Sequence, residues 1–177
     1  MTLKKFARLA PFLLTLVLAG CGGGGSAEEA RAYCPQPFTV QDAGRLTHFR
    51  DGPGRDPRDV EWAAQLGQVR ATCTLRRSQM DVNLVLRIAV VAGPSVGAAP
   101  TRVPYFVRVI GSQGTVVQGQ DFIADYKLSA GTPRSGSQEE LSLTLPYSKL
   151  ADLNGYRIAV GLKPTQAELD YNRRGGQ

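Results

Sequence analysis

Apolar and polar residues alternate at every second position through much of the chain after residue 60. The clearest run has five apolar residues of one parity: Val82, Leu84, Leu86, Ile88 and Val90. The positions of the opposite parity include Asp81, Asn83 and Arg87. Alternation with a period of two is typical of a strand that buries one face. The sequence therefore predicts a strand over 82–90.

Two shorter alternating runs precede this strand. In the first, Val60, Trp62, Ala64 and Leu66 share a face, and in the second the set is Val69, Ala71, Cys73 and Leu75. The parity changes across Leu66-Gly67-Gln68, which predicts a bulge or turn there. Cys73 is then expected to point toward the core.

The second half of the chain contains the remaining predicted strands. A strand over 105–110 turns at Ser112-Gln113-Gly114 into a return strand that includes Phe122, Ala124 and Tyr126, which predicts a hairpin. Residues 129–138 are polar and are expected to form a loop. Leu141, Leu143 and Leu145 predict a strand that Pro146 ends, and 156–162 is the last strand.

A short helix is predicted at the C-terminal end. Thr165 stands three residues before Glu168, which is the spacing of a capping box, and the helix is expected to run to about Asn172 and to pack at the sandwich edge. About seven strands without intervening helices predict an all-β fold, an antiparallel β-sandwich of immunoglobulin or fibronectin type III character. Trp62 stands too close to Cys73 for the immunoglobulin cysteine pattern.

The N-terminal segment has the layout of an export signal. Lys4, Lys5 and Arg8 precede an apolar run over 9–19, which is shorter than the roughly 20 residues of a membrane-spanning helix. The sequence Leu-Ala-Gly-Cys at 18–21 resembles the lipobox of bacterial lipoproteins. The resemblance implies cleavage before Cys21, a diacylglyceryl group on its sulfur and acylation of the new amino group. The alternative is an ordinary signal peptide with an accidental cysteine at its boundary.

These features divide the chain into three parts: a signal peptide over 1–20, a lipidated Cys21 with a flexible leash over 21–32, and a β-sandwich domain over 33–177. Residues 27–32 are polar and are expected to be mobile. In the enterobacterial sorting pattern an Asp after the lipidated cysteine retains a protein in the inner membrane. Gly22 occupies that position here, which implies an outer-membrane anchor with the domain facing the periplasm.

The other two cysteines, Cys34 and Cys73, form an even count in an exported, oxidising compartment. They predict a structural disulfide. A redox-active thiol or a metal site is the alternative, but the sequence has no Cys-x-x-Cys and a single histidine.

The formal charge of +6 excludes no partner by itself, because part of it leaves with the signal. Removal of 1–20 takes three basic residues and leaves 18 basic and 15 acidic residues, a charge of +3. The basic residues form no run longer than a pair, whereas a nucleic-acid surface needs a clustered basic face. Nucleic acid is therefore not an expected partner.

Candidate catalytic motifs are weak. Gly93 to Gly97 spells G-x-S-x-G around Ser95, but prolines follow in place of the helix of a nucleophile elbow, and the only histidine, His48, precedes the serine. His48 is expected to be a surface or strand-edge residue. The acidic stretch 51–59 lacks the spacing of a calcium loop and is expected to be a solvated turn.

Paired carboxylates and exposed aromatics are the other candidates. Glu139 and Glu140 are adjacent, so on a strand they face opposite sides and cannot share a site. Most aromatic residues alternate into the core. Tyr147, in Pro146-Tyr147-Ser148, and the loop 131–135 are the exceptions that could bind a ligand.

The chain as a whole resembles a group of uncharacterised proteobacterial envelope lipoproteins with an immunoglobulin-like domain. The segments that carry this resemblance are Cys34-Pro35, 42–49, 104–107, and 156–172 with Gly161 and Tyr171-Asn172. The resemblance covers nearly all of the mature domain and implies its fold and location. It brings no activity with it.

Together these features predict a noncatalytic protein without cofactor or metal, bound to the bilayer through acylated Cys21. Its expected role is protein interaction in envelope assembly or maintenance, and a sheet edge such as 105–110 is expected to accept a partner strand. A carbohydrate- or peptidoglycan-binding module on the same scaffold is the alternative.

Overall fold

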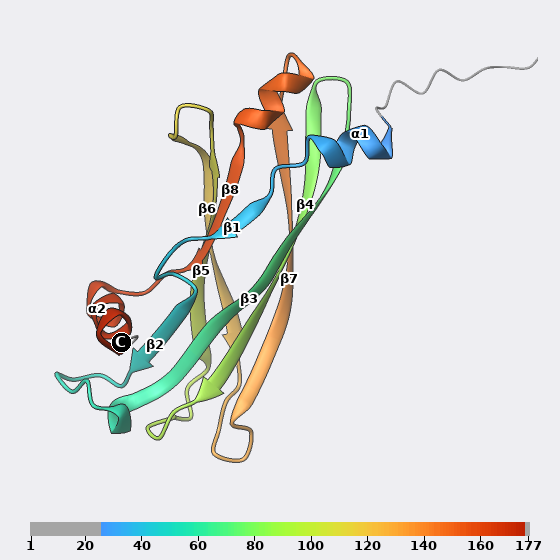
Figure 1. The fold of residues 1–177 in the computed structure, drawn as a ribbon. Coiled ribbons are helices and arrows are strands. Elements are labelled where there is room, and N and C mark those ends of the chain that lie inside the picture. Colours follow the sequence, from blue (N-terminus) through green and yellow to red (C-terminus); the bar gives the residue numbers. More distant parts are fainter. Residues whose placement is uncertain (1–25, 176–177) are drawn as a thin grey trace, which may run out of the picture.

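The computed structural model describes residues 26–175 as a sandwich of two four-stranded β-sheets with short helices at its periphery (Figure 1). One sheet has the order β1-β8-β5-β6, and the other has the order β2-β3-β4-β7. The strands are β1 (Pro37–Thr39), β2 (Arg45–Phe49), β3 (Val60–Leu75), β4 (Gln79–Ala92), β5 (Thr101–Ile110), β6 (Val116–Tyr126), β7 (Arg134–Pro146) and β8 (Arg157–Leu162). The helices are α1 (Ala27–Ala32), η1 (Pro57–Asp59), η2 (Leu150–Gly155) and α2 (Gln166–Gly175). The predicted all-β sandwich with a C-terminal helix is confirmed.

The topology has two features that the sequence did not predict. β1 and β8 pair in parallel, while every other pair among the described strands is antiparallel. The last strand, β8, lies between β1 and β5, and β7 belongs to the other sheet. In an immunoglobulin domain the last two strands are neighbours in one sheet, so the strand order here is different.

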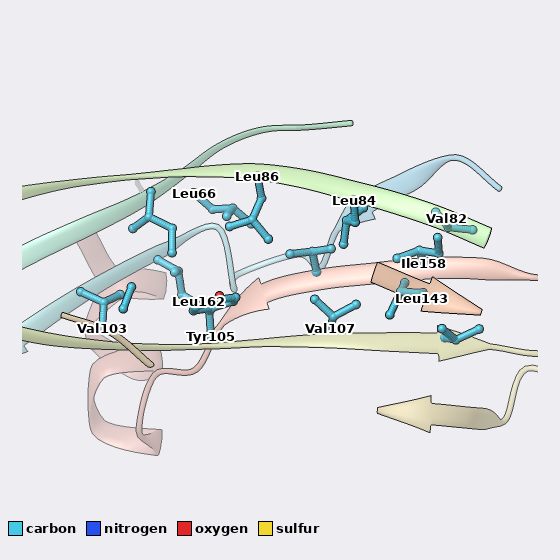
Figure 2. Close-up of a cluster of buried hydrophobic side chains, with 14 of the residues drawn as sticks. Leu66, Val82, Leu84, Leu86, Val103, Tyr105, Val107, Leu143, Ile158 and Leu162 are labelled. Carbon is cyan, nitrogen blue, oxygen red and sulfur yellow. The ribbon is translucent and has the colours of Figure 1, made fainter. Parts of the chain in front are cut away.

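The core lies between the sheets and is built by the alternating positions. The inward side chains of β4 are at most 1% exposed: Met80, Val82, Leu84, Leu86, Ile88 and Val90. Figure 2 shows Leu84 and Leu86 pointing from β4 toward Tyr105 and Val107 on β5. The strand predicted over 82–90 is therefore confirmed, together with the direction of its apolar face.

The predicted irregularities also lie where the sequence placed them. The register of β3 against β4 shifts between Leu66 and Val69, so the bulge is confirmed. β5 and β6 form the predicted hairpin, with Gly114 at a positive φ of 76° in its turn. Glycine adopts that conformation without strain because it has no Cβ atom. β7 ends at Pro146 as predicted.

Two predictions of the local structure are wrong, and two strands were missed. Residues 27–32 form helix α1, which begins with the side chain of Ser26 accepting a hydrogen bond from the Glu29 backbone and buries Ala30. β1 and β2 were not predicted. Residues 134–138 belong to β7 and not to a loop, since Arg134 to Gln138 pair with Val91 to Arg87 on β4.

Helix α2 begins with the predicted capping box. The Glu168 carboxylate accepts from the Thr165 backbone N–H at 2.7 Å, and the Thr165 hydroxyl accepts from the Glu168 N–H at 3.4 Å. The helix packs beside β2 at the edge of its sheet, where the Phe49 and Tyr171 rings meet edge to face at 4.8 Å (Figure 1). Its predicted start and its position at the sandwich edge are confirmed.

Candidate functional site

The predicted disulfide is present, while the predicted lipidation site, Cys21, lies outside the described residues. Cys34 and Cys73 are joined with a Cα–Cα distance of 5.6 Å across 39 positions. Both residues are half-buried. The bond joins the segment after α1 to β3 and so holds the N-terminal part of the domain against the sandwich.

The two sides of the sandwich differ in how their edge strands are protected. On one side of the sandwich the edge strands are short: β1 has three residues, and β2 has five, a register shift and α2 beside it. On the other side the edge strands are β6, with 11 residues, and β7, with 13. Neither has a neighbour on its outer edge among the described residues. A long unpaired edge offers backbone N–H and C=O groups to another strand.

The sequence predicted an open sheet edge at 105–110, and this prediction is wrong. Residues 105–110 belong to β5, which pairs with β6 on one side and β8 on the other, so its hydrogen-bonding groups are occupied. The sequence showed that a strand was present but not its place in the sheet. That place depends on long-range pairing, which a local pattern does not contain.

A polar cluster lies between the sheets on this open side. The Tyr126 hydroxyl bonds to the Ser137 hydroxyl at 2.6 Å, and the Tyr105 hydroxyl donates to the Glu139 carboxylate at 3.3 Å. Burial, followed by the charge of Glu139, raises the pKa of Tyr105 far above its usual range. The inward residues Ser135, Ser137, Glu139 and Leu141 are only half-buried. The sandwich is thus incompletely closed between β6 and β7.

Glu139 and Glu140 face opposite sides of β7, as predicted. Glu139 points toward the other sheet, and Glu140 is exposed and accepts from the Gln138 amide at 3.0 Å. The two carboxylates therefore cannot act as a catalytic pair.

Tyr147 lines a groove at the end of the sandwich near η2. The groove has a volume of about 780 Å³, and its walls come from the β5–β6 hairpin and from the segment between β7 and β8. Its polar lining includes Ser112, Gln113, Thr115, Ser148 and Asp152. The hydroxyls of Tyr147 and Tyr156 donate to the backbone carbonyls of Arg76 and Pro146, which holds both rings in place. Of the two loop exceptions predicted from the sequence, this one lies in a groove.

His48 lies on β2, an edge strand, as predicted. Its Nδ1 is 2.7 Å from Glu168 Oε1, its Nε2 is 3.9 Å from Glu61, and its ring stacks on Trp62 at 4.7 Å. The hydrogen bond to Glu168 is the main cause of a raised His48 pKa. Burial alone would raise the pKa of Glu168, but its bonds to His48 and Thr165 hold it below the usual value. The pair joins α2 to β2.

Ser95 occupies a turn between β4 and β5. Its hydroxyl donates to the Arg58 carbonyl at 2.6 Å, and its backbone N–H donates to the Val60 carbonyl at 2.9 Å. The next regular element is strand β5, so the serine does not stand before a helix as in a nucleophile elbow. The G-x-S-x-G sequence here fixes a loop onto the start of β3.

The acidic stretch 51–59 uses its carboxylates locally. Asp56 caps η1, and Asp59, which is buried, pairs with Arg50 at 2.6 Å and accepts from the Asp56 N–H. Apart from Asp59 and the half-buried Gly54, every residue of the stretch is exposed, as expected for a solvated turn. Within residues 26–175, no cluster of three or more His, Cys, Asp or Glu side chains has the geometry to hold a metal ion.

No helix among the described residues is long and apolar enough to span a membrane. Searches for similar proteins gave no match, whether to a protein-family model, a curated protein or a solved structure. The geometry of the chain's own residues therefore carries the functional argument.

Proposed function

We propose that this chain is a noncatalytic, lipid-anchored protein of the bacterial outer membrane, that it faces the periplasm, and that it binds other envelope proteins. The observation that carries the interaction role is the open side of the sandwich, where β6 and β7 present long edges without neighbours in the described chain. Strand addition to such an edge is a recurrent mode of peptide recognition.

The anchor part of the proposal rests on the sequence. The Leu-Ala-Gly-Cys motif at 18–21 follows a basic and then apolar segment, and the disulfide suits an oxidising compartment. Two or three acyl chains hold a protein at a bilayer stably, whereas one chain binds reversibly. An anchored domain would meet partners at the membrane surface.

Photo-crosslinking in cells tests the interaction role. A photoreactive residue at Ser142, exposed on β7, should give discrete adducts with envelope proteins, because a bound strand would lie beside it. The same residue at Asn83, exposed on the neighbouring inner strand β4, is the matched control and should give fewer adducts. Equal adducts at both positions, or none, would remove the proposal.

A second candidate function is binding of carbohydrate or peptidoglycan in the groove that contains Tyr147. The observation that favours this function is a polar groove that contains the fixed ring of Tyr147. The ring suits the apolar face of a sugar, and the polar lining suits its hydroxyls. Saturable binding to purified cell-wall fragments should be lost in Tyr147→Ala and kept in Tyr147→Phe, which retains the ring. Equal binding by both variants would exclude this groove.

A further inference from the structure

The edge of β7 is the more regular of the two open edges. β7 pairs with β4 over all 13 of its residues without a register shift, whereas β6 has a shift near Val116 against β5. β7 contains no proline before its last residue and no lysine. It therefore lacks most of the features with which proteins block pairing at an edge.

The one blocking feature of β7 is charge. Glu139, next to the middle of the strand, points inward, and Glu140 points outward. Neither carboxylate belongs to an ion pair within the described residues. Arg87, on the neighbouring strand, donates to Gln138 at 3.3 Å and not to Glu140.

These charges decide which strand the edge can accept. An apolar strand added beside β7 would cover Glu139 and leave its carboxylate with only the Tyr105 hydroxyl, which is costly for a buried charge. A strand that brings a cation to each side would neutralise both groups. Adjacent residues on a strand face opposite sides, so two consecutive basic residues meet this requirement.

A second copy of the chain is a poor occupant of the same edge when the two strands pair about their middle residue. Glu140 is the middle residue of Arg134–Pro146. A symmetric antiparallel pair of β7 strands centred there would place the two Glu140 side chains opposite each other, and like charges at opposite positions are unfavourable. That self-pairing register is thus unfavourable, whereas a partner strand with adjacent basic residues complements both carboxylates.

We propose that the free edge of β7 binds an extended segment of a partner protein as a fifth strand of the sheet, with consecutive Lys or Arg residues beside Glu139 and Glu140. This inference rests on the proposed interaction function and specifies its partner chemistry. The added strand would also cover the half-buried inward residues Ser137 and Leu141.

Hydrogen exchange with defined peptides tests this proposal. The probe is a capped peptide of about ten alternating Thr and Val residues with two adjacent lysines at its centre, and the control peptide carries two glutamates instead. With the purified full chain, the lysine peptide should slow exchange in 134–146 and bind about fivefold more tightly than the glutamate peptide. Protection in 116–126 alone, or equal binding of both peptides, would overturn the proposal.

Charge reversal supplies the matched variants. Glu140→Lys should reverse the preference so that the glutamate peptide binds more tightly, while Asp125→Lys on β6 should leave the preference unchanged. Glu140 is exposed and its side chain bonds only to Gln138, so the fold should tolerate the change. An unchanged preference in Glu140→Lys would contradict the proposal.

The two experiments separate this inference from the proposed function. Adducts at Ser142 in cells without any lysine preference would overturn the basic-strand inference and keep the interaction role. A lysine preference in the absence of adducts would support the inference for the edge and count against a protein partner in the envelope.

Discussion

Gly93 and Ser95 hold the chain where β4 turns toward β5. A Cβ atom on Gly93 would lie 2.1 Å from the backbone oxygen of Val60, a distance that no side chain can occupy. The glycine therefore permits the close approach through which the Ser95 N–H reaches that same oxygen. This packing accounts for Gly93 and Ser95 of the G-x-S-x-G sequence without any catalytic role.

The first prediction follows from this contact. Gly93→Ala should destabilise the protein by about 1–3 kcal/mol, because the backbone of β3 or of the turn must move to admit the methyl group. Gly131→Ala is the control, since the nearest atom to its Cβ lies 3.9 Å away, and it should change stability by less than about 0.5 kcal/mol. Urea unfolding measures both. A Gly93→Ala variant as stable as the control would contradict this role.

The strands differ in how well the sequence predicts them, and the reason is burial. β4 is covered by the opposite sheet along its length, so its inward positions are apolar and the alternation is visible. The first half of β7 faces the open side, and its inward positions are Ser135, Ser137 and Glu139, so the apolar alternation is missing there. In β2 the register shift between His48 and Phe49 breaks the period. The apolar alternation is therefore lost in β2 and in the first half of β7, whereas the edge strand β6 follows a readable hairpin turn.

One missed element had a readable signal. Ser26 stands three residues before Glu29, which is the same capping-box spacing that correctly predicted α2. The segment is short and follows four glycines, so its polar composition favoured a leash over a helix. The capping signal at Ser26 outweighs the polar composition of the segment, and a helix forms.

The second prediction concerns the attachment of α2. The raised pKa of His48 means that its bond to Glu168 is strongest when the imidazole is charged and weakens as the pH rises through that pKa. The lowered pKa of Glu168 keeps the carboxylate charged down to below its usual 4.5. The pair should therefore contribute most between the usual values of 4.5 and 6.5 and lose its contribution toward pH 8.

Urea unfolding at pH 6 and pH 8 tests this dependence. The unmodified protein should lose stability toward pH 8, by less than about 1 kcal/mol because the His48 ring is 42% exposed. His48→Gln should show no such loss, since the chain has no other histidine. An equal loss in both proteins would exclude the pair as its cause.

At the scale of the whole molecule, the disulfide connects the segment after α1 to β3 of the sandwich. Closing a loop across 39 positions should stabilise the fold by about 4 kcal/mol in the chain-entropy model. The free energy of unfolding should fall by about 4 kcal/mol when the bond is reduced. It should fall by a similar amount in the double variant Cys34→Ala and Cys73→Ala. A change below about 1 kcal/mol would mean that the bond constrains the unfolded chain little.

The fold class and the disulfide could be predicted from the sequence, but the open side could not. Alternation gives the faces of a strand, while the pairing of β7 with β4 and the central place of β5 come from contacts between distant segments. Glu139 and Glu140 were correctly assigned to opposite faces. Their importance depends on the missing neighbour of β7, which no local pattern shows.

The central claim is a disulfide-bonded sandwich held at the bacterial envelope by a lipid on Cys21, and intact-mass analysis tests it most directly. The protein should be purified from bacterial membranes and measured with thiol alkylation before and after reduction. We expect a chain that begins at Cys21 with added acyl mass, and Cys34 and Cys73 that are alkylated only after reduction. A chain without acyl mass, or cysteines that are alkylated before reduction, would contradict the account.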